Sequence, residues 1–342
     1  MVRNEVRAKH GALSRLCALL LAAMMLVSPL LTDIAQAQMQ IPPPPSGRAG
    51  GGAAVLSTSI VATDSATYLT FHTTGRVQFI FRYTRETVSL YIEGAGSFPT
   101  GVVNIGTNPI FTSGSWSGNA LRLPLTVRDG FMGYRSFYDE NDNLVIRFRN
   151  PPSSMAVTRI VIDPGHGGQD RGAEGFRPDL PEAVINRQMS HLLAEELRAR
   201  GATVLVLDTA PGMEIQERVR QAQQFDADFF ISVHNNAARN PNARGTEVYF
   251  FTPFSHVMAA TVSRNVSNNL DTINRGARRA RFSVTTSPQF ISVMVEAGFM
   301  TNLAEYEKLI TPSYQQGVAQ GIANAVATMV YHAYPGTGRR LS

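Results

Sequence analysis

The stretch Arg159-Ile160-Val161-Ile162-Asp163-Pro164-Gly165-His166-Gly167-Gly168 joins a short apolar run to a loop rich in glycine. An unbroken apolar run of this length predicts a buried strand over residues 159–163. The glycines beside His166 allow the backbone to approach a ligand closely, because they carry no side chain. The elements that follow decide to what kind of sheet this strand belongs.

Predicted helices and strands alternate after the first strand. Residues 183–200 carry apolar residues at the helical period and are followed by Gly201, a typical helix stop. Further strands are expected at 203–207, 229–233, 247–251 and 291–295, and further helices at 214–224, 256–270 and 313–332. Such alternation is typical of a mostly parallel sheet with helices on both faces. We therefore predict an α/β domain over residues 155–335.

Residues 54–150 show another pattern, in which short alternating apolar and polar runs are separated by turn residues such as Thr74-Gly75. The runs lie at 67–71, 76–83, 87–92, 121–123 and 143–148. They predict a small all-β, sandwich-like antiparallel domain. Its one histidine, His72, is expected to be a surface residue, and Pro151-Pro152-Ser153-Ser154 marks the boundary to the α/β domain.

The first 37 residues have the order of a secretory signal peptide, with a basic start, an apolar run from Leu16 to Leu31 and small residues at Ala35 and Ala37. We expect cleavage near Ala37 and export to the periplasm, with no membrane span after cleavage. The alternative is an uncleaved anchor, but this run is shorter than the roughly 20 residues that a spanning helix needs. The Pro/Gly-rich residues 38–53 then form a linker.

Charge and cysteine content limit the chemistry of the mature protein. The only cysteine, Cys17, lies in the signal, so cleavage leaves no disulfide, no thiol nucleophile and no thiolate metal ligand. The whole chain carries +5 and residues 1–37 carry +2, so +3 remains, which suits an anionic wall polymer but not a nucleic acid. A basic cluster is expected to be a solvated loop, with a phosphate or wall-polymer contact as the alternative; it comprises Arg275, Arg278, Arg279 and Arg281.

Several polar residues are expected at the carboxyl edge of the predicted sheet, where open α/β sheets bind ligands. His166, His234 and Glu296 each follow a predicted strand, and Glu182 begins the helix that leads back from the first one. Two histidines and one carboxylate, with a fourth position open, form a catalytic zinc arrangement. We therefore expect one Zn²⁺ on His166, Glu182 and His234.

Glu296 is then available as the carboxylate that accepts a proton from water and returns it to a departing amine. Its apolar neighbours are expected to raise its pKa. Each of the four residues alone has an ordinary structural alternative, such as an ion pair, and only their expected meeting at one edge makes a site. Three further histidines of the predicted α/β domain are expected to be surface or capping residues; they are His191, His256 and His332.

The sequence resembles the zinc-dependent N-acetylmuramoyl-L-alanine amidases of the amidase 3 family over residues 158–332. The matching blocks are residues 160–168, Glu182 with Asn186, and residues 231–237, 244–248, 275–276 and 295–302. The resemblance implies metal ligands at His166, Glu182 and His234 and a catalytic carboxylate at Glu296. It also implies hydrolysis of the amide between N-acetylmuramic acid and L-alanine in peptidoglycan, in wall remodelling and daughter-cell separation.

Residues 54–150 resemble the AMIN domain, chiefly in their strand pattern, which implies peptidoglycan binding or localisation, with an activator or divisome protein as a candidate partner. The chain departs from the family at Leu207, where an arginine is usual, and at Pro181 and Asn235. Some relatives carry a long helix that plugs the zinc site. The segment 252–274 is too short for it, so no internal plug is expected.

Two other functions remain open at this stage. One is a zinc peptidase acting on wall stem peptides, because the same metal and glutamate serve both reactions. The other is an inactive wall-binding module, which the presence of all four site residues argues against.

Overall fold

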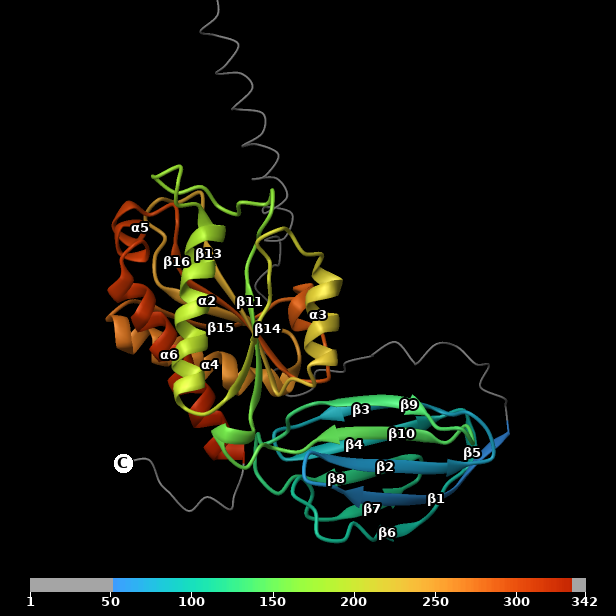
Figure 1. Ribbon diagram of the computed structural model, residues 1–342. Helices are drawn as coiled ribbons and strands as arrows, with labels where there is room; N and C mark the ends of the chain where they lie inside the picture. Colours follow the sequence, from blue (N-terminus) through green and yellow to red (C-terminus); the bar gives the residue numbers. More distant parts are fainter. Residues whose placement is uncertain (1–51, 334–342) are drawn as a thin grey trace, which may run out of the picture. The chain divides into compact units, whose positions relative to one another are not determined.

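A computed structural model describes residues 52–333 of the 342-residue chain (Figure 1). The predicted signal peptide, nearly all of the predicted linker and the last two residues of the predicted α/β domain lie outside the described residues. Between 52 and 333, no helix combines the length and the apolar character needed to cross a membrane.

The N-terminal region folds into ten strands in two five-stranded sheets. The strands are β1 (Ala53–Ala62), β2 (Ala66–Thr73), β3 (Gln78–Tyr83), β4 (Thr87–Glu93), β5 (Ala95–Ser97), β6 (Gly101–Val103), β7 (Gly114–Ser117), β8 (Ala120–Pro124), β9 (Tyr134–Tyr138) and β10 (Leu144–Arg149). One sheet has the order β5-β1-β2-β10-β9 and the other β3-β4-β8-β7-β6. The all-β prediction is therefore confirmed, although β5 pairs with β1 in parallel.

The two sheets are held together by the inward side chains of alternating strands. In β4, Val88, Leu90 and Ile92 are buried while the residues between them are not. Aromatic contacts join the sheets: the Phe71 ring of β2 lies 5.9 Å from the Trp116 ring of β7, centroid to centroid. Such edge contacts add to the stabilisation from burial.

The C-terminal region is an α/β domain with a six-stranded sheet in the order β12-β11-β13-β16-β14-β15. Its strands are β11 (Arg159–Pro164), β12 (Thr203–Val206), β13 (Phe229–Asn236), β14 (Thr246–Phe250), β15 (Asn274–Arg279) and β16 (Ile291–Phe299). All neighbours pair in parallel except β14 and β16, which are antiparallel. This confirms the prediction of a mostly parallel sheet.

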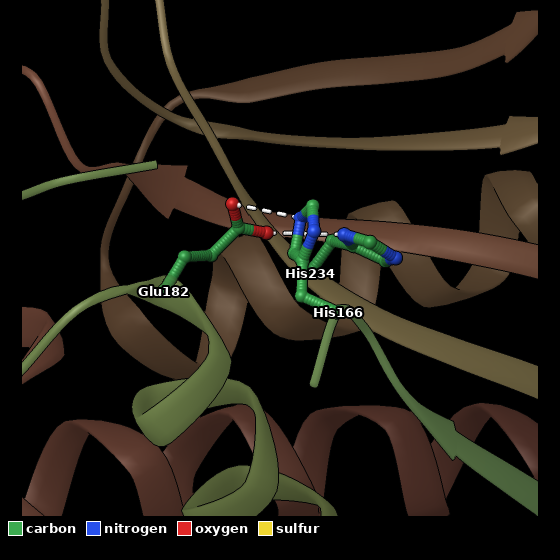
Figure 2. Close-up of side chains that lie close together, drawn as sticks. All are labelled: His166, Glu182 and His234. Carbon is green, nitrogen blue, oxygen red and sulfur yellow. Dashed lines mark hydrogen bonds and ion pairs between the residues drawn. The ribbon is translucent and has the colours of Figure 1, made fainter. Parts of the chain in front are cut away.

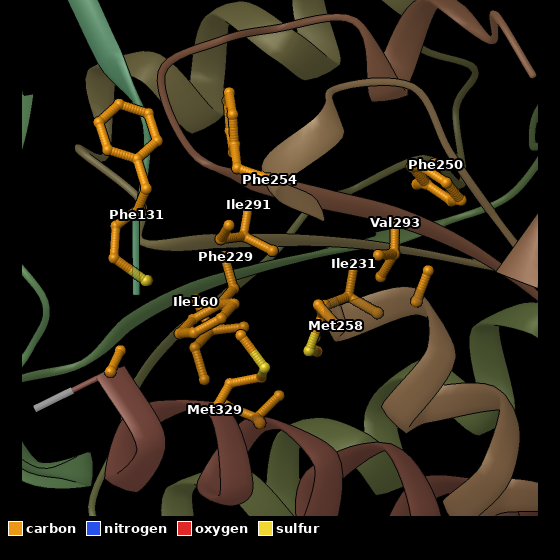
Figure 3. Packing of buried hydrophobic residues seen from close by; sticks show 14 of the residues in the cluster. Phe131, Ile160, Phe229, Ile231, Phe250, Phe254, Met258, Ile291, Val293 and Met329 are labelled. Atoms are coloured by element: carbon orange, nitrogen blue, oxygen red, sulfur yellow. The ribbon is translucent and has the colours of Figure 1, made fainter. Parts of the chain in front are cut away.

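Helices cover both faces of this sheet (Figure 1). They are η1 (Met155–Val157), α2 (Glu182–Ala199), α3 (Ile215–Gln224), η2 (Pro253–Ser255), α4 (His256–Leu270), η3 (Ser283–Thr285), α5 (Leu303–Leu309) and α6 (Pro312–Ala333). Helices α2, α4 and α6 pack together on one face and α3 lies on the other. Figure 3 shows Ile231 and Val293 of the sheet above Met258 of α4.

Arg149, at the end of β10, joins the β region to the α/β domain through buried polar contacts. Its Nη1 donates to Asp228 Oδ1 at 3.0 Å, its Nη2 pairs with the carboxylate of Asp226, and its Nε donates to the carbonyl of Gln289 at 3.2 Å. Burial raises the pKa of Asp228, while the charge of Arg149 opposes that rise. Phe131 packs beside Phe254 in the same core (Figure 3).

The structure corrects three expectations from the sequence. Residues 274–279 of the basic cluster are not a solvated loop but form β15, the edge strand of the sheet. Strands β13 and β16 extend to Asn236 and Phe299, so His234 and Glu296 lie inside strands and do not follow them. Helix α5 was not expected, and its Asn302 cap accepts the backbone N–H of Glu305.

Candidate metal centre

His166, Glu182 and His234 converge in the α/β domain, as Figure 2 shows. Each offers one ligand atom, and these atoms all lie within 4.8 Å of one another. His166 Nε2 is 3.0 Å from Glu182 Oε2, and His234 Nδ1 is 3.0 Å from Glu182 Oε1. Two imidazole nitrogens therefore face one carboxylate, which is a donor set suited to a divalent metal ion.

The loop after β11 brings His166 to this position through close backbone packing. His166 has a φ of 66°, and a Cβ on Gly165 would lie 2.3 Å from Cε1 of His234. A Cβ on Gly167 would lie 1.8 Å from the carbonyl oxygen of Thr209. Glycine is therefore required at 165 and 167, because any larger residue would displace His234 or the neighbouring loop.

Asp170 orients the His166 ring, since its Oδ2 lies 2.8 Å from Nδ1 and leaves Nε2 directed at Glu182. A carboxylate on the outer nitrogen of a ligating histidine is a common feature of metal sites, and it fixes the ring and its tautomer. Asp170 is itself held by the backbone N–H of Gly172, which donates to Oδ1 at 3.0 Å.

Glu182 is buried at the start of α2 and accepts hydrogen bonds from several directions. The backbone N–H of Ala173 donates to Oε2 at 2.8 Å, and that of Asn235 donates to Oε1 at 3.1 Å. Asn186 Nδ2 donates to Oε1 at 3.2 Å, and Asn235 Nδ2 in turn donates to Asn186 Oδ1. This network fixes the carboxylate toward the two histidines.

Electrostatics in the cluster favour positive charge between Glu182 and the histidines. Burial alone would lower the pKa of His166, but hydrogen bonds and charges from Glu182 and Asp170 outweigh it and raise that pKa to about 9. Burial alone would raise the pKa of Glu182, but both histidines outweigh it and the pKa falls well below its usual range. An environment that attracts a proton so strongly also attracts a metal cation.

Glu296 lies directly opposite His234 in the pairing of β16 with β13. Its side chain is buried, and Oε2 has no hydrogen-bond partner among residues 52–333. Burial, and then the charges of Glu182 and Glu247, raise its pKa well above the ordinary value. A buried carboxyl whose Oε2 has no partner within the protein is available to exchange a proton with a bound molecule.

The structure thus brings together all four residues that the sequence selects, and it adds supporting residues that the sequence did not reveal. Asp170 carried a signal, since it follows His166 by four residues, whereas Arg218 carried none. From α3, Arg218 donates to Asp163 Oδ1 at 2.7 Å and to the carbonyls of Pro164 and His166 at 3.0 Å. Leu207, at which the sequence departs from the pattern that it resembles, is only 2% exposed. The His166 loop is supported by Arg218.

The other four histidines between residues 52 and 333 stay away from the cluster. His72 is half-buried in β2, with Nε2 3.0 Å from Ser59 Oγ, and His191 is exposed on α2. His256 begins α4 against Phe250, and His332 near the end of α6 contacts the carbonyl of Arg128. None of these side chains belongs to the candidate metal site.

Comparison with known proteins finds relatives that match about half of this chain. The family model described as N-acetylmuramoyl-L-alanine amidase, amidase 3, matches residues 160–328. The uncharacterized protein YqiI of Bacillus subtilis is 34% identical over 172 residues, which are 49% of this chain and 82% of YqiI. The amidase LytC of the same organism is 36% identical over 168 residues, 48% of this chain and only 34% of LytC.

A solved structure, that of the amidase AmiC2 of Nostoc punctiforme, is similar at 34% sequence identity with a TM-score of 0.47. It covers 50% of this chain and 96% of AmiC2.

Proposed function

Because the chain belongs to the amidase 3 family of N-acetylmuramoyl-L-alanine amidases, we propose that it hydrolyses the amide between N-acetylmuramic acid and L-alanine in peptidoglycan with one Zn²⁺. Membership confirms the resemblance that the sequence alone indicated. The observation that carries the proposal is the convergence of His166, Glu182 and His234 beside Glu296.

The three ligand side chains fit zinc rather than a harder ion. Zn²⁺ accepts imidazole nitrogen and carboxylate oxygen together, whereas Mg²⁺ and Ca²⁺ prefer oxygen alone. His166 would bind through Nε2, His234 through Nδ1 and Glu182 through its carboxylate, the atoms that already face one another. The bound ion would supply Lewis-acid polarisation of the scissile carbonyl and a lowered pKa for water.

Glu296 performs the proton transfers in this proposal. Its unpartnered Oε2 accepts a proton from the attacking water, and the same carboxyl then delivers that proton to the departing nitrogen of L-alanine. Burial and the charges of Glu182 and Glu247 raise the pKa of Glu296, so this carboxyl holds a proton more readily than an ordinary glutamate does between the two steps.

Digestion of purified sacculi with the mature protein, residues 38–342, tests the function. We expect released stem peptides that begin with L-alanine, together with glycan strands that carry no peptide. Treatment with a chelator should abolish the release, and added Zn²⁺ should restore it. Cleavage within the stem peptides would instead support the peptidase alternative, and no release under any metal condition would support the inactive wall-binding module.

Asp170→Asn is expected to weaken zinc binding by about 10–100-fold, because an amide orients the His166 ring less strongly than a carboxylate does. The measurement is competition for Zn²⁺ with a chromophoric chelator. Asp179→Asn is the matched control, since Asp179 is an exposed carboxylate in the same loop region that pairs only with Arg177. Equal zinc affinity in both variants would contradict a role for Asp170 in the site.

The N-terminal β region would deliver this activity to the wall. We propose that residues 54–150 are an AMIN-like domain that binds peptidoglycan or localises the enzyme, and that the exported protein acts in the periplasm during daughter-cell separation. An activator or divisome protein is the expected partner. The segment after β14 supports the expectation of no internal plug, because α4 takes up 15 residues of it and packs against the sheet and α6.

A further inference from the structure

A row of paired residues crosses the sheet at the candidate site. His234 of β13 pairs with Glu296 of β16, and Glu296 pairs with Glu247 of β14. Paired residues on neighbouring strands project from the same face of a sheet. Glu247 therefore lies on the same face as Glu296 and His234, one strand farther toward the sheet edge.

Glu247 is only 3% exposed, and its carboxylate receives four contacts. Asn236 Nδ2 donates to Oε1 at 2.8 Å and the Tyr249 hydroxyl donates to Oε1 at 2.7 Å. Arg275 Nε donates to Oε2 at 2.7 Å, and Arg278 Nε lies 2.8 Å from the same oxygen. Two arginines of β15 are thus fixed by one buried carboxylate.

The ion pairs of Arg275 and Arg278 with Glu247 leave an excess of positive charge. Two guanidinium groups share one carboxylate, and no other carboxylate between residues 52 and 333 pairs with either of them. The Arg275 side chain is 30% exposed and that of Arg278 is 46% exposed. Each uses Nε toward Glu247, and Arg275 Nη1 also donates to the carbonyl of Arg244 at 3.4 Å. The remaining Nη donors of the two guanidinium groups are available to a carboxylate.

Arg275 also lies on the catalytic face. Its Cζ is 5.0 Å from the centre of the Phe299 ring, and Phe299 pairs with Asn236. The register between β13 and β16 shifts between these pairs, so Phe299 and Glu296 face the same side although three positions separate them. The Arg275 side chain therefore lies on the same face of the sheet as Glu296.

The spacing suits a peptide that extends from the scissile bond. Strands in a sheet lie about 4.8 Å apart, which puts β14 one spacing and β15 two spacings, or about 10 Å, from Glu296. Two extended residues span about 7 Å, and the arginine side chains reach back toward Glu247. A carboxylate on the second residue of a bound stem peptide would therefore come within reach of the arginine pair.

We propose that Arg275 and Arg278, held by Glu247, form the subsite that binds a free carboxylate of the peptidoglycan stem peptide next to the scissile amide. This inference rests on the proposed amidase function and adds a determinant of substrate specificity. The simpler alternative is an ion-pair cluster that only fastens the edge strand β15 to β14. That role requires no carboxylate on the substrate.

The test compares two muramoyl tripeptides whose second residue is a glutamate joined to the third through its γ-carboxyl. They differ only in the α-carboxyl of that glutamate, which is free in one and amidated in the other. We expect the wild-type protein to favour the free acid by about 10–100-fold in kcat/KM, the range of a charged hydrogen-bonded pair. Arg275→Gln combined with Arg278→Gln should remove that preference by raising KM for the free acid, with little change in kcat or in hydrolysis of the amide.

Arg279→Gln is the matched control, because Arg279 lies on the same strand but pairs with Phe250 in the strand register and donates to the carbonyl of Phe251. It should keep the full preference. If the double variant fails to fold, Arg278→Gln alone retains the Arg275–Glu247 pair and should lose part of the preference. Equal wild-type activity on both peptides, or equal losses on both in the variants, would overturn the subsite; no wild-type hydrolysis of either would instead refute the proposed function.

Discussion

Glu296→Gln is expected to lower kcat by about 10²–10⁴-fold, the usual contribution of a positioned general acid–base group. Glutamine keeps the size and shape of the side chain in its buried place between β13 and β14, but it cannot accept a proton from water. The rate is measured on sacculi or a muramoyl peptide. Bound zinc, measured on the same sample, should stay at the wild-type level, because Glu296 is not among the three clustered ligands.

Glu174→Gln provides the control for this substitution. Glu174 is an exposed carboxylate in the loop before α2, where it pairs with Arg171. The same chemical change there should leave both turnover and zinc content unaltered. Hydrolysis by Glu296→Gln within about tenfold of wild type would exclude Glu296 as the proton acceptor, since the loss expected for that role is larger.

Arg149→Ala is expected to destabilise the fold by about 3–5 kcal/mol, the cost of removing one partner from a buried ion pair. The substitution leaves Asp228 buried without its guanidinium and removes the hydrogen bond to Gln289. Equilibrium unfolding in urea at neutral pH measures the loss. Arg76→Ala is the control, because Arg76 and Asp142 form an exposed pair of similar length, and exposed pairs contribute about 0–1 kcal/mol.

The loss in Arg149→Ala should depend on pH in a defined direction. Burial already raises the pKa of Asp228, and without Arg149 that pKa rises further. The folded variant then binds a proton more readily than the unfolded chain, so its stability relative to wild type falls as the pH rises. The deficit should be largest near neutral pH and smaller toward about pH 4, near the ordinary pKa of aspartate. An equal deficit at both pH values would contradict this account.

The sequence predicted those elements in which the spacing of apolar residues shows which face is buried. The helices 183–200, 256–270 and 313–332 appear within one residue as α2, α4 and α6, because long apolar periods identify a packed face. Strand β15 escaped prediction because Asn274–Arg279 is almost entirely polar and pairs along only one side, with β14. The pairing of β15 with β14 joins segments that are distant in the sequence, and the composition of residues 274–279 does not indicate it.

The four principal site residues could be selected because polar groups near strand ends in an α/β sheet meet at one edge. The residues that support these four could not be selected from the sequence. Arg218 reaches the His166 loop from a helix 52 residues farther along the chain, and Glu247 is held by side chains of β13 and β15 that are distant from it in the sequence. Such contacts follow from three-dimensional packing, which local patterns do not encode.

The reversed direction of β14 also has an evolutionary consequence. Since β13 ends and β14 begins at the same edge, the connection 237–245 crosses the end of β16 above the site. It is fastened to the turn after β16 by Ala238, whose N–H donates to Thr301 Oγ1, and by Asn302, which donates to the carbonyl of Pro241. Lengthening this connection would change the surface near the carboxyl end of β16 while leaving the ligand-bearing elements untouched, so evolution could alter the surroundings of the site without rebuilding its chemistry.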